Sequence, residues 1–453
     1  MVAGAPGRAA RRDEEVAVAE QAVPVGRRVQ SRIYREGALG RRPVVPVSAD
    51  RLERSARRAM SRAAWAYVAG SAGQQRTARA NREALDRRRL VPRVLRDVSS
   101  RTTDVELFGQ RLPSPFLLAP IGVLEMAHRG ADVAVARASA ATGTPMVLST
   151  QGSAPMETTA RALGSTAPWY QLYWSSDRDL VRSLVRRAEA IGSTALVVTL
   201  DTTLLGWRPR DLDLGSLPFA RGLGIAQYTS DPVFTELVRR RASRPRTGPT
   251  PRPTPAALRT LVSVARHHPG STRANLRAMA PRAAVETFLD VFADPTLTWT
   301  DLAWLRDLTS LPIVLKGIQH RDDAALAVEH GMDGVVVSNH GGRQVDGAVG
   351  ALDALPGVVE EVAGRLPVLF DSGVRSGADA VTALALGARA VLVGRPYVYG
   401  LALAGTAGVV EVLEHLHAEL DLTMGLVGAR SVHELGPHLL TKAVAAAESG
   451  GAR

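Results

Sequence analysis

The sequence predicts an α/β protein built as a (β/α)8 barrel, and three observations lead to this prediction. First, eight short apolar runs of strand length recur along the chain. Second, stretches between these runs place Ala, Leu and Val with helical spacing. Third, six of the seven gaps between the ends of successive runs measure 23–31 residues, which is one strand, one helix and two short loops. Apolar strands that alternate with helices indicate a parallel sheet covered on both faces, and eight such units favour a closed TIM barrel over a doubly wound open sheet.

The expected strands occupy the part of the chain from residue 116 to residue 394. They cover residues 116–120, 145–150, 169–173, 194–201, 312–316, 333–339, 367–371 and 390–394. The barrel domain as a whole is expected over residues 49–435, and it begins with a helical segment at 49–68.

Three segments lie outside this regular pattern. Residues 1–48 are expected to form a basic, poorly ordered N-terminal arm, and residues 436–453 a C-terminal tail. The one long gap, of 115 residues after the fourth strand, holds an Arg/Pro-rich insertion at about 237–285. Its composition predicts a mobile or partly disordered segment. Because loops that follow barrel strands lie on the active-site face, we also expect it to act as a lid.

The composition excludes several classes of protein. The chain has 453 residues, of which 45% are hydrophobic and 22% charged, as in ordinary globular proteins. It has no uncharged apolar run long enough to span a membrane. It also has no cysteine, which excludes disulfides, thiolate metal sites and a cysteine nucleophile. The N-terminal arginines are not followed by an apolar stretch, so we expect no secretion signal and a cytoplasmic location.

The positive net charge does not predict a nucleic-acid-binding surface. Residues 1–62 carry a net charge of +7 and residues 237–285 carry +11, so the rest of the chain sums to −6 of the total +12. Neither basic segment interleaves aromatic residues with its arginines, and we interpret both as solubilising segments. Only Lys316 and Lys442 are lysines, and Lys316 ends an apolar run, where an unpaired charge is costly.

Polar and charged residues gather at the carboxyl ends of the expected strands, the face on which such barrels carry catalysis. The set comprises Gln171, Tyr173, Thr199, Asp201, Arg208, Lys316, Ser338, His340, Arg343, Asp371, Gly373, Arg375, Gly394 and Arg395. The glycines beside Arg375 and Arg395 are typical of a phosphate site, and the cations fit a phosphate cofactor together with an anionic substrate. His340 is a natural base, and Asp201 is a natural partner to orient it.

Each of these residues, taken alone, also has a purely structural explanation. His340 could be a hydrogen-bonded turn residue, Asp201 could cap the next helix, and Lys316 could pair with a structural carboxylate. The glycines could serve only turns. The prediction of a pocket therefore depends on the recurrence of all of them at strand ends with barrel spacing.

The segment SNHGGRQVDG (338–347) resembles the active-site signature of the FMN-dependent 2-hydroxy acid oxidizing enzymes, such as glycolate oxidase, lactate oxidase and mandelate dehydrogenase. Supporting matches are AYVAGSAG (66–73), QLYW (171–174), VTLDTT (198–203), VLKGI (314–318), DSGVRSGAD (371–379) and VGRP (393–396). The resemblance covers roughly residues 49–435 without most of the insertion. It implies FMN as cofactor, a small 2-hydroxy acid and O2 as reactants, and a homo-oligomer, a tetramer or an octamer.

The resemblance also implies a role for each matching residue. His340 would be the base that starts oxidation, with Asp201 paired to the resulting imidazolium. Substrate contacts would come from Tyr67, Arg208 and Arg343 at the carboxylate and from Tyr173 at the hydroxyl or keto oxygen. Lys316 would stabilise the anionic reduced flavin ring. The other implied flavin contacts are Pro120, Ile121, Gly122, Ser149, Gln171 and Thr199 around the ring, and Asp371, Gly373, Arg375, Gly394 and Arg395 at the ribityl and phosphate.

Two features favour the lactate 2-monooxygenase subgroup, which converts lactate and O2 into acetate, CO2 and water. Gly122 stands where the oxidases more often carry alanine, and GWRPRDLD (206–213) precedes a long loop. An oxidase or dehydrogenase that releases the 2-keto acid, with H2O2 when O2 is the acceptor, is the alternative. Two further hypotheses come from other classes. One is a non-flavin barrel lyase or isomerase that uses Lys316 as a Schiff-base lysine, and the other is an inactive barrel that serves as a scaffold.

Overall fold

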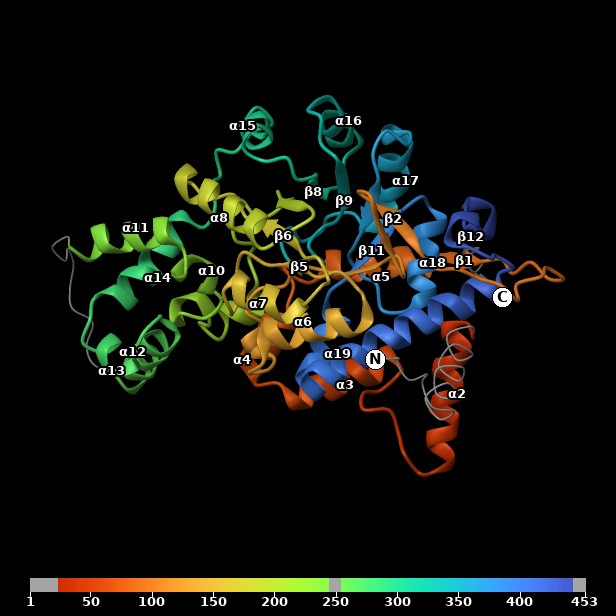
Figure 1. Cartoon of the computed structure of the whole chain (residues 1–453), viewed down its shortest axis with the longest axis horizontal. Coiled ribbons are helices and arrows are strands. Elements are labelled where there is room, and N and C mark those ends of the chain that lie inside the picture. Colours follow the sequence, from red (N-terminus) through yellow and green to blue (C-terminus); the bar gives the residue numbers. More distant parts are fainter. Residues whose placement is uncertain (1–22, 244–253, 443–453) are drawn as a thin grey trace, which may run out of the picture.

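The computed structural model describes residues 23–243 and 254–442 (Figure 1). Within these residues, the centre of the fold is an eight-stranded parallel sheet with the strand order β4-β11-β10-β9-β8-β7-β6-β5. A parallel bridge between Leu118 and Met146 joins the two ends of the sheet and closes the barrel. The strands are β4 (Phe116–Leu118), β5 (Val147–Leu148), β6 (Trp169–Leu172), β7 (Leu196–Thr199), β8 (Ile313–Ile318), β9 (Gly334–Val337), β10 (Val368–Phe370) and β11 (Ala390–Val393). The predicted TIM barrel and its eight strands are confirmed.

The barrel strands are buried along almost their whole length because they have neighbours on both faces. Every residue of β7 and β9 is buried, and both strands consist mainly of valine and leucine. Branched side chains suit a sheet that faces side chains inside the barrel and helices outside it. The polar residues begin where the strands end, so the apolar pattern itself directs them to one face of the barrel.

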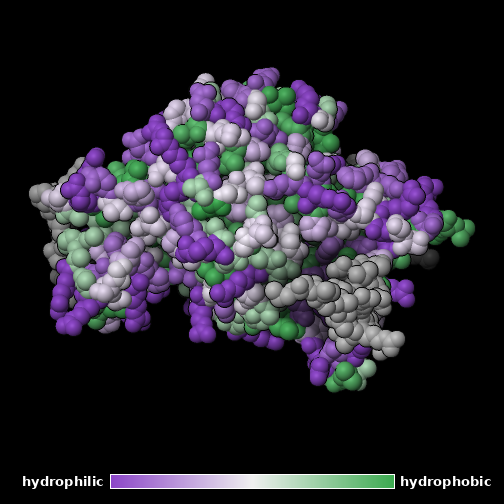
Figure 2. Space-filling view, viewed as in Figure 1, coloured by the Kyte–Doolittle hydropathy of each residue, from purple (hydrophilic) through white to green (hydrophobic). Residues whose placement is uncertain are grey.

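Helices connect the strands and form the outer layer (Figure 1). The helices that follow successive barrel strands are α6 (Ala131–Thr142), α7 (Met156–Leu163), α8 (Arg178–Ala190), α15 (Asp301–Leu308), α16 (Arg321–Glu329), α17 (Ala351–Val362), α18 (Gly377–Ala385) and α19 (Arg395–Leu426). Before the barrel come α3 (Ala49–Ala59), α4 (Arg62–Ala69) and α5 (Arg76–Asp86), so the expected helical segment at 49–68 is present as α3 and α4. On the face shown in Figure 2, hydrophobic residues are interspersed among hydrophilic ones.

Helix α19 is long and apolar enough to cross a membrane, but its packing is that of a core helix. In the most apolar 18-residue stretch of this helix, 61% is buried inside the protein. Non-helical backbone at Ala404 and Gly405 divides it into two helices, and it contacts α2, α3, α6 and α18. Its apolar residues therefore serve the core of this fold.

The N-terminal arm is more ordered than predicted, and residues 1–22 lie outside the described part of the chain. Helix α2 (Val25–Ala38) packs on α19. The Gly26 amide donates to Asp421 Oδ2 at 2.9 Å, and Arg32 pairs with Glu414 at 2.5 Å. The interpretation of this segment as a poorly ordered arm overlooked Val25, Val29 and Ile33, which are spaced four residues apart as on one face of a helix, and Val29 is buried.

The C-terminal tail is likewise structured as far as residue 442. Strand β12 (Leu440–Lys442) pairs antiparallel with β1 (Arg88–Leu90) and follows the short turn η4 (Pro437–Leu439). A second small sheet joins β2 (Val105–Leu107) to β3 (Gln110–Leu112). Pairing with a strand some 350 residues away along the chain has no local sequence signal, so the sequence did not predict β12.

The insertion after β7 is a helical subdomain on the described residues, which corrects the prediction of a mobile or partly disordered segment. Residues 244–253 of the predicted segment lie outside the described part. The elements are α9 (Pro209–Leu212), η2 (Pro218–Arg221), α10 (Ala226–Thr229), α11 (Pro232–Ala242), α12 (Pro255–His267), α13 (Thr272–Asn275) and α14 (Ala280–Val291). Phe219, Tyr228, Phe234 and Phe288 are buried and pack ring against ring at its centre. Three of these four rings precede the Arg/Pro-rich stretch and the fourth follows it. The composition of the stretch alone therefore gave no sign of the aromatic core on which it packs.

Candidate active site

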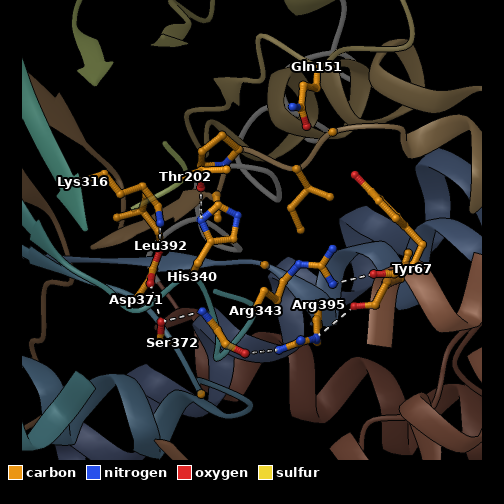
Figure 3. A pocket seen from close by; sticks show the side chains of 18 of the residues that line it. Tyr67, Gln151, Thr202, Lys316, His340, Arg343, Asp371, Ser372, Leu392 and Arg395 are labelled. Carbon is orange, nitrogen blue, oxygen red and sulfur yellow. Dashed lines mark hydrogen bonds and ion pairs between the residues drawn. The ribbon is translucent and has the colours of Figure 1, made fainter. Parts of the chain in front are cut away.

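A pocket of about 1000 Å³ lies at the carboxyl ends of the barrel strands (Figure 3). Fourteen of the predicted site residues line it: Tyr67, Pro120, Ile121, Gly122, Tyr173, Arg208, Lys316, His340, Arg343, Asp371, Gly373, Arg375, Gly394 and Arg395. Strand ends supply most of them, and Tyr67 comes from α4. The structure thus places these fourteen residues around one pocket.

The other four predicted residues are at the same strand ends but are not among the residues that line the pocket. Ser149 donates to Gln171 Oε1 at 3.0 Å, and Gln171 Nε2 donates to Thr199 Oγ1 at 2.9 Å. All three side chains are buried on neighbouring strand ends. Asp201 lies at the end of β7, and its carboxylate points toward His340.

His340 and Asp201 form a tight pair. His340 Nδ1 lies 2.8 Å from Asp201 Oδ1, and Thr202 Oγ1 donates to the same carboxylate oxygen at 2.9 Å. Burial alone would raise the pKa of Asp201, but His340 and Lys316 outweigh it and lower the pKa to about 2. The carboxylate is therefore ionised and accepts the Nδ1 proton, which leaves Nε2 of His340 as the ring nitrogen with a free lone pair.

The pKa of His340 is lowered from its ordinary value of 6.5. The main cause is burial, and Lys316 and Arg208 add to it, while Asp201 opposes it. At neutral pH the imidazole is thus uncharged and available as a base.

Lys316 is buried next to carboxylates. Its Nζ lies 2.9 Å from Asp371 Oδ2 and donates to Ser338 Oγ at 2.7 Å. Burial lowers the pKa of Lys316, but Asp371 and Asp201 outweigh this effect and raise it above 10.5. The lysine is therefore a permanent cation at neutral pH. We call Lys316, Asp371, His340 and Asp201 the base half of the pocket.

The pocket is also lined by Arg208, Arg343, Arg375 and Arg395, which we call the arginine half. Figure 3 shows Arg343 and Arg395, with Lys316 and Asp371 on the other side of His340. Arg343 donates to the backbone oxygens of Tyr67 at 2.5 Å and Gly70 at 2.9 Å. Arg395 donates to the backbone oxygens of Val68 and Gly341 at 3.0 and 3.1 Å. Among the described residues, none of these four guanidinium groups forms an ion pair.

Without a carboxylate partner, two buried arginines of this half have lowered pKa values. Burial lowers the pKa of Arg343 to about 9, and the nearby charge of Arg208 adds to the shift. Burial similarly lowers the pKa of Arg395 to about 10. An anion in the pocket would relieve both shifts, so the arginine half is built to receive negatively charged groups.

Two tyrosines complete the pocket as hydrogen-bond donors. Burial raises the pKa of Tyr67 despite the opposing charges of Arg343 and Arg208. Burial and the charge of Asp201 raise the pKa of Tyr173. Both hydroxyls are therefore protonated, and the Arg343 guanidinium lies 5.1 Å from the ring centre of Tyr67.

The backbone conformation explains why two glycines follow His340 in the 338–347 segment. His340, Gly341 and Gly342 all have left-handed backbone, with φ of +57°, +63° and +77°. A side chain at Gly342 would collide with the backbone of Ala78 at 2.6 Å, so glycine is needed there. Left-handed backbone at His340 itself is uncommon, and such strain concentrates at functional sites.

Gly122 lies directly against Gln151. An added methyl group there would lie 2.7 Å from Cβ of Gln151 and 3.0 Å from its backbone oxygen. The space beside Gly122 is therefore filled by Gln151 and is not free room for oxygen or product.

Sequence analysis also missed several pocket residues. They are Val68, Gln151, Thr202, Leu205, Phe219, Gly341, Ser372, Val374 and Leu392. Gln151 and Ser372 directly follow predicted strand ends, which was a usable signal. Leu205 and Phe219 belong to the insertion, and only its folding brings them to the pocket.

Comparison with known proteins gives consistent matches over most of the chain. A family model described as FMN-dependent dehydrogenase matches residues 56–442. An FMN-dependent alpha-hydroxy acid dehydrogenase from Penicillium citrinum is 43% identical over 404 residues, which are 89% of this chain and 92% of the relative. An L-lactate oxidase from Lysinibacillus sphaericus is 37% identical over 397 residues, 88% of this chain and 93% of the relative. The crystal structure of mandelate oxidase with (S)-4-hydroxymandelic acid aligns with a TM-score of 0.72 and 36% identity, over 88% of this chain and 99% of that one.

Proposed function

Because the chain belongs to the FMN-dependent dehydrogenase family, whose members oxidise 2-hydroxy acids, we propose that it oxidises a small L-2-hydroxy acid with O2 as the acceptor. Within this class we propose the lactate 2-monooxygenase outcome, in which the decarboxylated acid, CO2 and water are released. The observation that carries the oxidation of a 2-hydroxy acid is the pairing of an uncharged, oriented imidazole with a cluster of uncompensated arginines in one pocket. The monooxygenase outcome is supported by GWRPRDLD (206–213) ahead of the long insertion.

The pocket residues fit FMN. The guanidinium groups of Arg375 and Arg395 donate only to neutral groups among the described residues, so a phosphate group would give both cations their missing counter-charge. The hydrogen-bonded chain of Ser149, Gln171 and Thr199 offers polar atoms for a flat, heteroatom-rich ring. When bound, FMN accepts the two electrons that leave the substrate.

The proposed carboxylate site consists of Arg343, Arg208 and the hydroxyl of Tyr67. A guanidinium fork can hold a planar carboxylate by two parallel hydrogen bonds and so fix its orientation. Arg208 Nε donates to the backbone oxygen of Arg343 at 3.1 Å, which fixes these two arginines relative to each other. Such fixation orients the bond that reacts, and correct orientation is a large part of catalysis.

His340 is the proposed base. Nε2 takes a proton from the substrate, and the resulting imidazolium is stabilised by Asp201, which remains ionised. Tyr173, with its protonated hydroxyl, donates a hydrogen bond to the substrate hydroxyl or keto oxygen. Lys316 stays positively charged throughout and favours negative charge that develops beside it.

The raised pKa of Lys316 also argues against the lyase hypothesis, because a Schiff-base lysine must lose its proton to act as a nucleophile. The family assignment removes the scaffold hypothesis as well.

The test is anaerobic addition of L-lactate to the purified flavoprotein, followed by product analysis under air. Loss of the flavin absorbance under anaerobic conditions is the expected result. Acetate and CO2 as products support the monooxygenase outcome. Pyruvate and H2O2 in equal amounts would replace it by the oxidase outcome, and an unchanged spectrum with every short L-2-hydroxy acid would overturn the proposal.

A further inference from the structure

One polar side chain in the pocket wall has no use in the mechanism above. Gln151 follows β5 and lines the pocket, and only 8% of the residue is exposed. Its backbone is held firmly, since its amide donates to Ser149 Oγ at 3.1 Å and its carbonyl accepts from Val123 at 2.9 Å. Its side-chain amide, by contrast, forms no hydrogen bond with any described residue.

The amide of Gln151 lies where Gly122 leaves room for it. A side chain at Gly122 would come within 2.7 Å of Gln151 Cβ and 3.3 Å of its Oε1. The two positions are therefore complementary: the absent side chain of one makes space for the long side chain of the other. Figure 3 shows the Gln151 amide and the Tyr67 hydroxyl directed into the same part of the pocket.

The pocket has apolar as well as polar lining residues. Ile121, Leu205 and Phe219 line the pocket along with Gln151. A side-chain amide offers two donors and one acceptor, and leaving them unpaired among apolar groups is unfavourable. A pocket that needed only to hold a methyl group would gain nothing from glutamine at this place.

The remaining groups of the pocket define what reaches Gln151. In the proposed function, Arg343 and Tyr67 hold the substrate carboxylate, and His340 lies at the reacting carbon. The substrate side chain is then the group that faces the remaining part of the pocket wall, which includes Gln151. We propose that Gln151 binds a polar group on that side chain, and that the preferred substrate is a short 2-hydroxy acid with a neutral hydrogen-bonding group, such as a hydroxyl, on its third carbon. This inference rests on the proposed function and narrows its substrate class.

A matched pair of substrates tests it, because L-glycerate is L-lactate with one added hydroxyl at the third carbon. We expect kcat/KM of the holoenzyme to favour L-glycerate by about fivefold, the usual value of one neutral hydrogen bond. Gln151→Met keeps the length and removes the polar atoms, and should abolish this preference by weakening L-glycerate. Gln319→Met is the matched control. Like Gln151, Gln319 has a side-chain oxygen without a partner among the described residues, but it does not line the pocket. The ratio of kcat/KM for L-glycerate to that for L-lactate in Gln319→Met should therefore equal the wild-type ratio.

A binding measurement separates this inference from the proposed function. Hydroxypyruvate and pyruvate are titrated into the oxidised holoenzyme, and the perturbation of the flavin absorbance gives both dissociation constants. We expect about fivefold tighter binding of hydroxypyruvate in the wild type and equal binding in Gln151→Met. If neither hydroxy acid is oxidised, the proposed function fails, while the ratio of these constants still decides about Gln151.

Three results would overturn the inference. One is a wild-type preference for L-lactate and pyruvate. Another is a substrate ratio that Gln151→Met leaves unchanged. The third is an equal loss for both substrates together with weaker FMN binding, because the amide would then serve the cofactor.

Discussion

In the base half of the pocket, each nitrogen that carries or takes a proton has a carboxylate next to it. Lys316 lies 2.9 Å from Asp371, and His340 lies 2.8 Å from Asp201. In the arginine half, the guanidinium groups of Arg343 and Arg395 donate to neutral oxygens, and their pKa values fall to about 9 and 10. The base half is thus electrostatically complete in the protein alone, whereas the arginine half becomes complete only when anions bind. The protonation states of His340 and Lys316 are therefore set before any ligand binds, whereas the arginines form their ion pairs only with the ligands.

The largest expected effect comes from removing the base. His340→Ala should lower the rate of anaerobic flavin reduction by about 10²–10⁴-fold, the range for general base catalysis, while FMN stays bound. Stopped-flow absorbance measures the rate, and the flavin-to-protein ratio is the control. A variant that keeps more than a few per cent of the wild-type rate would place the base elsewhere.

Stability should distinguish the two halves directly. Lys316→Met leaves Asp371 and Asp201 without their cation, and breaking a buried pair from one side costs about 3–5 kcal/mol. Arg343→Met removes a cation that has no carboxylate partner, so its stability without substrate should be equal to or above that of the wild type. Urea unfolding at saturating FMN compares the two variants. Equal destabilisation would mean that both halves are compensated alike.

Arg343→Lys tests whether the arginine half recognises shape as well as charge. Lysine keeps the charge but cannot form two parallel hydrogen bonds with a carboxylate. Loss of a charge-assisted hydrogen bond costs about 1.5–3 kcal/mol, which corresponds to about a 10- to 150-fold decrease in kcat/KM. A decrease of less than threefold would remove Arg343 from the carboxylate site.

The smallest expected effect is on the pH profile. Because burial lowers the pKa of His340 below 6.5, the rate of flavin reduction should rise with pH through a midpoint below 6.5 and then stay level to pH 8. Asp201→Asn removes the charge that partly sustains this pKa, so it should move the midpoint further down and lower the plateau. A midpoint above 7 in the wild type would contradict the assignment of an uncharged His340.

The sequence predicted the barrel and most of the pocket because both follow from local patterns. Buried parallel strands read as continuous apolar runs, and the polar residues that end them share one face by the geometry of the fold. His340 and Asp201 are 139 residues apart, yet their places at strand ends were enough to bring them together.

What the sequence did not predict depends on contacts without local periodicity. Helix α2 packs on a helix more than 350 residues away along the chain, and the aromatic rings at the centre of the insertion's subdomain all lie outside residues 237–285. Gly317 is a further example. It has a φ of +112°, and a side chain there would lie 3.0 Å from Cβ of Asp201, so this glycine allows the carboxylate its position. Such a requirement is visible only when the two strand ends lie side by side.

Oxalate tests most directly whether a bound anion completes the arginine half. This small dicarboxylate has no hydrogen to lose, so it binds without reacting. At about 100 times its dissociation constant it should stabilise the holoenzyme by about 2.7 kcal/mol. The measurement is the melting temperature of wild type and Arg343→Met over a series of oxalate concentrations. The account predicts a rise with concentration in the wild type and a flat line in Arg343→Met; parallel rises in the two proteins, or none in the wild type, would contradict it.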